Sequence, residues 1–145
     1  MMLGPSIFCR VFSTTYVGSD LSDMAMVYGG RTTSLPSQVL TFHSSTKWNE
    51  HFDAFKKTNK LMVVDFTASW CRPCKLMDPV IQEFAATFRD VEFVKIDVDE
   101  LMEVAELFQV QGMPTFMLIK KGKVTDKVVG VKKEELQRLI EQHRK

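Results

Sequence analysis

The sequence predicts one α/β domain in which a central mixed β-sheet is flanked by helices on both faces. Apolar runs of strand length alternate with segments of helical periodicity, an order typical of strands connected by helices that pack on a sheet. The last two runs are separated only by Lys121-Gly122-Lys123, which predicts a β-hairpin and therefore an antiparallel pair. A chain of 145 residues with 45% hydrophobic content can bury the core of one such domain.

The first half of the domain is expected to hold two strands and two helices. These are a strand over 38–42, a helix capped within Ser44-Ser45-Thr46 with Trp48, Phe52 and Phe55 in the core, a buried strand over 61–67, and a helix with a buried stripe of Leu76, Val80, Ile81, Phe84 and Phe88. Pro79 falls inside this second helix and is expected to bend it, because proline removes one i to i−4 hydrogen bond.

The second half adds three strands and two helices. The expected elements are a strand over 91–98 that is central enough to be apolar on both faces, a short helix marked by Leu101, Val104, Ala105 and Phe108, hairpin strands over 115–120 and 124–129, and a final helix with Leu136, Leu139 and Ile140 facing inward.

Trp70-Cys71-Arg72-Pro73-Cys74 joins the strand over 61–67 to the helix that follows, and its cysteine spacing predicts a dithiol that closes as a disulfide. Pro73 suits the first turn of a helix, so Cys71 is expected at the helix N-terminus. There the free backbone N–H groups and the helix dipole favour a thiolate, and a fall in its pKa from about 8.5 to about 7 would ionise roughly half of it at neutral pH. Cys71 is the predicted nucleophile, and Cys74, one turn further in and more buried, is the predicted resolving thiol.

This stretch resembles the thioredoxin family. The likeness rests on Phe66-Thr-Ala-Ser-Trp-Cys-Arg-Pro-Cys-Lys75, with Asp65 before it and Gly112-Met113-Pro114-Thr115 later, and it covers about residues 38 to 145. It is greatest to the plant h-type thioredoxins that carry an N-terminal extension, and it implies the thioredoxin fold. Arg72 departs from the family pattern, which usually has Gly, or in some plant members Pro, at this position.

Asp65 stands in an apolar strand, where an ionised carboxylate is costly unless it is paired, and Lys95 on the third strand is its expected partner. The resemblance implies a second role, in which Asp65, through water, takes and returns the proton of the resolving thiol. Burial should raise its pKa toward the range of a general base.

The resemblance also implies a substrate groove. A cis bond is implied before Pro114, in a loop that faces the dithiol and offers backbone groups to an extended substrate. Trp70, as a partly open apolar platform beside an exposed thiol, Met113 and the backbone around Gly130 would complete the groove. Arg72 is expected to point partly to solvent and, as a permanent positive charge, to favour the Cys71 thiolate.

The implied activity is that of a thiol–disulfide oxidoreductase that reduces disulfides in protein substrates without a bound cofactor. Electrons would come from NADPH through a thioredoxin reductase, with a glutathione and glutaredoxin route as the alternative, and we expect a monomer. A different function stays open: a redox-regulated binding or chaperone module whose dithiol is incidental. A disulfide isomerase would be expected to carry His near the first cysteine, and a glutaredoxin more often has Pro-Tyr between its cysteines.

Composition argues against several other classes. Nineteen basic and 18 acidic residues give a net charge of +1, which does not suggest nucleic-acid binding. Three cysteines are too few for a disulfide framework, and one Cys-x-x-Cys lacks the four ligands of a structural zinc site. No run approaches the roughly 18 apolar residues of a transmembrane segment.

Residues 1–37 are expected to form a largely disordered extension, because they contain fourteen Gly, Ser or Thr and no sustained periodicity. Gly4 is not at position 2, so myristoylation is not expected. Arg10-Val11-Phe12-Ser13 resembles the processing site of a mitochondrial presequence, but the segment is poor in arginine. We therefore expect a cytoplasmic protein, with mitochondria as the alternative. Cys9 is expected to be an exposed thiol, with palmitoylation or redox chemistry as the alternative.

Overall fold

The computed structural model describes residues 38–145, which form five strands and four helices. In chain order these are β1 (Val39–Phe42), α1 (Ser45–Phe55), β2 (Leu61–Thr67), α2 (Arg72–Thr87), β3 (Val91–Asp97), α3 (Met102–Leu107), β4 (Thr115–Lys120), β5 (Lys123–Val129) and α4 (Lys133–His143). The predictions for the 1–37 segment, including Cys9 and the presequence-like stretch at Arg10, lie outside the described residues.

The strands form one mixed sheet in the order β1-β3-β2-β4-β5, which confirms the predicted fold class. β1 and β2 run parallel to β3, whereas β4 runs antiparallel to both β2 and β5. β2 is the central strand, and all seven of its residues are buried. The third strand is apolar on both faces, as predicted, because its neighbouring residues Phe93 and Val94 are buried in two different cores. Its three charged residues, Glu92, Lys95 and Asp97, are half-buried.

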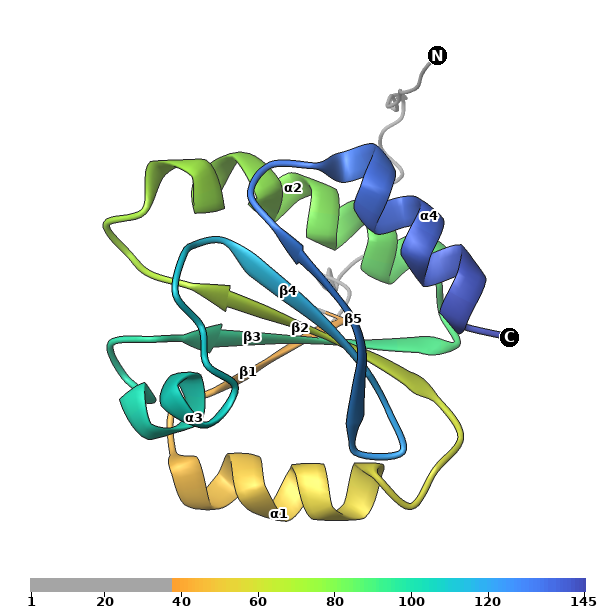
Figure 1. Ribbon diagram of the computed structural model, residues 1–145, viewed down its shortest axis with the longest axis horizontal. Helices are drawn as coiled ribbons and strands as arrows, with labels where there is room; N and C mark the ends of the chain where they lie inside the picture. Colours follow the sequence, from red (N-terminus) through yellow and green to blue (C-terminus); the bar gives the residue numbers. More distant parts are fainter. Residues whose placement is uncertain (1–37) are drawn as a thin grey trace, which may run out of the picture. The chain divides into compact units, whose positions relative to one another are not determined.

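Helices α2 and α4 cover one face of the sheet and α1 and α3 the other (Figure 1). Alternate residues of β2 therefore enter different cores, as the period of a strand requires. Val63 packs in a core with Phe84 of α2 and Leu136 of α4, and Val64 packs in the opposite core with Trp48 of α1. Within residues 38–145, no helix is long and apolar enough to cross a membrane.

The buried stripe of α2 differs from the predicted one at its first position. Leu76 is 63% exposed, whereas Met77 is buried together with Ile81 and Phe84. These three buried residues stand at i, i+4 and i+7, so they share one helix face and leave Leu76 outside it. Pro79 lies inside the helix, as expected.

The hairpin turn is one residue shorter than predicted. Lys120 pairs with Lys123, so the turn consists of Lys121 and Gly122 alone. Both have positive φ values, 54° and 82°, which is the pattern of the type I′ turn that matches the twist of a two-residue hairpin.

Candidate active site

The two cysteines form a disulfide at the point where β2 leads into α2. Their Cα atoms are 5.3 Å apart, well inside the range that a disulfide can bridge. Cys71 is the N-cap of α2, with Pro73 in the first turn, as the sequence predicted. The Cys74 backbone N–H donates to Cys71 Sγ at 3.3 Å, so the helix end already directs a hydrogen-bond donor at the sulfur that would carry negative charge.

Neither cysteine is open to solvent in this oxidised form. Cys71 is 4% exposed and Cys74 2%, so Cys71 is not the exposed thiol that the sequence suggested. The reason is local packing, since Ala68, Val98 and Met113 surround the pair in a small apolar cluster. Met113 is thus brought to the dithiol, as expected.

The loop before β4 reaches the disulfide because Thr115, the first residue of β4, pairs with Phe66 near the carboxyl end of β2. The Met113–Pro114 bond in this loop is cis. The Gly130 N–H donates to the Pro114 carbonyl at 2.9 Å, which joins this loop to the end of β5. Gly130 has a φ of 99° that favours glycine, and a Cβ placed there would meet no atom within 4 Å.

Trp70 lies beside the dithiol and is 68% exposed, as expected for an open apolar platform. Its Nε1–H donates to Asp99 Oδ2 at 2.9 Å, a contact that the sequence analysis missed. The topology could have indicated it, because the carboxyl ends of the parallel strands β2 and β3 meet at one edge of the sheet. Arg72, the first residue of α2, is exposed.

Asp65 lies in the middle of β2 and is only 2% exposed. It is on the side of the sheet that α2 covers, because Val63, two residues earlier, packs against that helix. Its Oδ1 has no hydrogen-bond partner. Burial raises the pKa of Asp65 to about 7; Lys95 opposes this rise and Asp78 adds to it. The carboxyl group therefore exchanges its proton near neutral pH.

The expected ion pair between Asp65 and Lys95 is not formed. The two residues are neighbours in the register of β2 and β3, but Lys95 Nζ bonds to Asp78 Oδ1 at 2.9 Å. Asp78 is partly exposed, so an ion pair with it removes less charge from water than one with buried Asp65. The sequence analysis overlooked Asp78, although it follows Cys74 by four residues and therefore shares its helix face.

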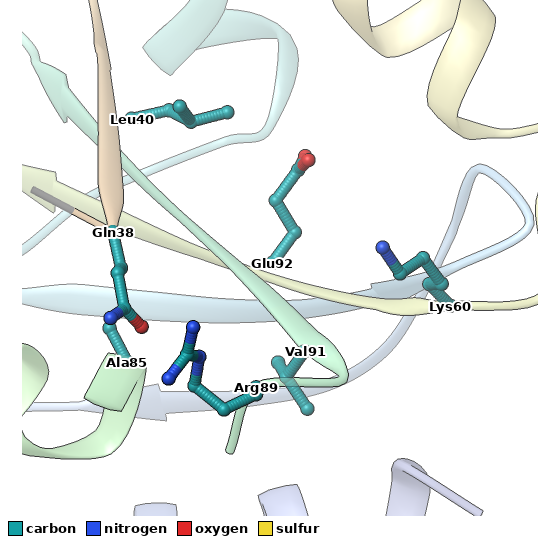
Figure 2. A pocket seen from close by; sticks show the side chains of 7 residues that line it. All are labelled: Gln38, Leu40, Lys60, Ala85, Arg89, Val91 and Glu92. Carbon is teal, nitrogen blue, oxygen red and sulfur yellow. The ribbon is translucent and has the colours of Figure 1, made fainter. Parts of the chain in front are cut away.

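Two surface pockets lie at opposite ends of the sheet. A cavity of about 160 Å³ lies beside the site, with Lys95, Asp78 and Asp97 in its wall. A cavity of about 250 Å³, with Lys60, Arg89 and Glu92 in its wall, is at the opposite end, where β2 and β3 begin (Figure 2). In the described part of the chain, no group of three or more His, Cys, Asp or Glu residues could hold a metal ion.

Comparison with known proteins agrees with this geometry. The thioredoxin family profile matches residues 41–142. Thioredoxin H2 from Arabidopsis thaliana is 52% identical over 109 residues, which are 75% of this chain and 82% of that protein. Thioredoxin H2-1 from Oryza sativa subsp. japonica is 52% identical over 104 residues, or 72% of this chain and 75% of the relative.

Solved structures give the same result. The crystal structure of thioredoxin NaTrxh from Nicotiana alata superposes with a TM-score of 0.75 at 56% identity, covering 79% of this chain and all of that one (100%). Mitochondrial thioredoxin 3 from Saccharomyces cerevisiae, in its oxidised form, superposes with a TM-score of 0.64 at 35% identity, covering 72% of this chain and 94% of that one. With a disulfide at a helix N-terminus, a cis-proline loop beside it and these relatives, the chain belongs to the thioredoxin family.

Proposed function

We infer that this thioredoxin reduces disulfides in protein substrates, and the observation that carries the inference is the Cys71–Cys74 pair closed at the N-terminus of α2. In the reduced protein, the Cys71 thiolate attacks one sulfur of a substrate disulfide. The substrate S–S bond breaks, a mixed disulfide forms, and the released substrate thiolate takes up a proton. The Cys74 thiolate then attacks Cys71 Sγ, which closes the enzyme disulfide and releases the second substrate thiolate.

Asp65 is proposed as the base that accepts the Cys74 proton, through water. Its pKa of about 7 supports this role, because a base whose pKa lies near the working pH both accepts and returns protons. The carboxyl oxygen without a protein partner leaves room for such an exchange. A second buried acid is not available at the site, since Asp65 is the only buried Asp or Glu among residues 38–145.

The substrate is proposed to lie across Trp70, Met113, the Pro114 loop and Gly130. Exposure of Trp70, packing of Met113 against the cysteines, and the open space at Gly130 support this path. An extended substrate segment could then add to the loop as a short strand, with its disulfide over Cys71.

Re-reduction of the disulfide is proposed to use NADPH through a thioredoxin reductase, with glutathione and glutaredoxin as the alternative donor, and without a cofactor bound to this chain.

The proposed location is the cytoplasm, with mitochondria as the alternative. The solved relatives include both an h-type and a mitochondrial protein, so the fold is compatible with either. Fusion of the 1–37 segment to a fluorescent protein tests this: cytosolic fluorescence is expected, and exclusive mitochondrial signal would overturn the proposal.

The test of the reaction is the Cys74→Ser variant of the full chain, mixed in its reduced form with disulfide-containing cell proteins. The mixed disulfide on Cys71 should persist, because no resolving thiolate remains, and mass spectrometry should find the adducts on that residue. The matched control, Cys71→Ser, should trap far less. An intact Cys74→Ser protein without adducts would refute the order of attack, and full cellular function of Cys71→Ser would favour a binding module instead.

A further inference from the structure

Near the resolving cysteine, two acidic side chains, Asp65 and Asp78, are possible ion-pair partners of one lysine, Lys95. Asp65 of β2 and Lys95 of β3 are directly paired in the strand register, so both side chains leave the sheet on the face that α2 covers. Asp78 of α2 reaches toward the same place from one helical turn beyond Cys74. Lys95 therefore has two carboxyl groups within the reach of its side chain and bonds to Asp78, at 2.9 Å.

The environment of the two acids explains this choice. The Asp78 side chain is 39% exposed and that of Lys95 32%, and both line the cavity of about 160 Å³. Ionised Asp65 would have to be paired almost fully out of water, which is the more costly arrangement. On its other side Asp65 faces Phe116 of β4 in the register, so no charge is supplied from there.

We propose that Asp78 is a positioning residue for this reaction: by holding the Lys95 ammonium at the cavity wall, it keeps Lys95 from pairing with Asp65 and leaves the Asp65 carboxyl free to exchange a proton with Cys74. This inference rests on the proposed role of Asp65. Lys95 from β3 and Asp78 from α2 are the charged groups that act on the pKa of Asp65, in opposite directions, which agrees with the proposed arrangement. Lys75 and Asp97 also line the cavity and complete its charged wall.

Removal of the Asp78 charge should make Asp65 a weaker base. In Asp78→Asn, Lys95 loses its ion-pair partner. Asp97 already accepts hydrogen bonds from the backbone N–H groups of Asp99 and Glu100, whereas Asp65 is the direct neighbour of Lys95 in the strand register and has a carboxyl oxygen without a partner. A new opposite charge beside a buried carboxyl group lowers its pKa by about one pH unit or more. The Asp65 carboxylate would then accept the Cys74 proton less readily, so the pH profile of the single-turnover step should move to lower pH.

The experiment is a ¹³C NMR titration of the Asp65 carboxyl in the full oxidised chain, paired with the pH profile of single-turnover substrate reduction. We expect Asp78→Asn to lower the Asp65 midpoint by about one pH unit. Asp78→Glu should restore it, because it keeps the ion pair. Glu83→Gln is the matched control: Glu83 is also on α2 and pairs with Lys133 at the same 2.9 Å, but its ion pair leaves Asp65 undisturbed.

A double-mutant cycle separates positioning from direct repulsion between the two acids. In a Lys95→Met background, Asp78→Asn should lower the Asp65 midpoint by much less, because no ammonium remains to move. An equal shift with and without Lys95, or no shift in Asp78→Asn, would overturn the proposal. So would a rate profile that stays in place while the Asp65 titration moves. The titration needs no turnover, so its failure is distinct from failure of the Cys74→Ser trap.

Discussion

Replacement of Asp65 by Asn should change how stability depends on pH. The folded pKa of Asp65 is about 7, against an ordinary value of 3.8, and burial is the main cause. Below about pH 4 the carboxyl group is protonated in both the folded and the unfolded chain, so it does not oppose folding. As the pH rises from 4 to 7, only the unfolded chain releases the proton. Wild-type stability should therefore fall across this window, and Asp65→Asn should remove this part of the fall.

The size of the effect follows from the two pKa values. A rise from 3.8 to about 7 corresponds to roughly 4 kcal/mol of folding free energy that is lost between pH 4 and pH 8. Asparagine has nearly the same shape but no titratable proton. Any hydrogen-bond penalty of its amide is independent of pH, so it cancels when the two ends of the window are compared.

The assay is urea unfolding of the oxidised full chain at several pH values from 4 to 8, for the wild type and the variant. The difference in free energy of unfolding, variant minus wild type, should increase by about 4 kcal/mol across the window. Glu83→Gln removes a partly exposed acid of α2, so the free energy of unfolding of this control relative to the wild type should stay nearly constant across the same pH range. Parallel curves for wild type and Asp65→Asn would show that Asp65 does not have a raised pKa and would remove the main support for its role as a base.

Three further predictions concern local features. Arg72→Gly should raise the pKa of the Cys71 thiol and make the protein a somewhat stronger reductant, because a positive charge beside the thiolate is lost. The pH dependence of the alkylation rate measures the pKa, equilibration with glutathione measures the reduction potential, and a shift of either in the opposite direction would contradict the prediction. Gly122→Ala should lower the free energy of unfolding by about 1 to 2 kcal/mol, because its φ of 82° disfavours a side chain; chemical denaturation without loss would contradict it. Met77→Ala should cost about 2 to 5 kcal/mol and exposed Leu76→Ala less than about 0.5, and equal losses would contradict the assigned buried face of α2.

The elements and the dithiol could be predicted from the sequence because their signals are local. A buried strand followed by Cys71, Pro73 and Cys74 fixes a strand-to-helix junction through spacing and turn preference alone. The position of Leu76 could not be obtained in this way, because a leucine beside Met77 fits either edge of an apolar stripe until the helix start is known.

The ion pairing at the site depends on how α2 packs on the sheet, which the sequence pattern does not specify. Sequence pattern places Asp65 and Lys95 on neighbouring strands, and an acid next to a lysine suggests a pair. The actual partner of Lys95, Asp78, comes from a helix that crosses this face of the sheet, and its advantage over Asp65 is a difference in hydration. Hydration depends on the final packing of α2, which composition and periodicity do not specify.

The central place of β2 has a consequence for amide hydrogen exchange. β2 is paired with β3 from Leu61 to Thr67 and with β4 from Leu61 to Phe66, so the backbone of Asp65 has neighbouring strands on both sides. Its amide can exchange with solvent only when the sheet separates, at a free energy close to that of global unfolding. Cys71 is the N-cap of α2 and Cys74 lies in its first turn, and the end of a helix generally opens at a lower free energy than a central strand. Asp65 therefore belongs to a strand that opens only when the whole domain unfolds. Local motions that change its distance from the two sulfur atoms are expected in α2.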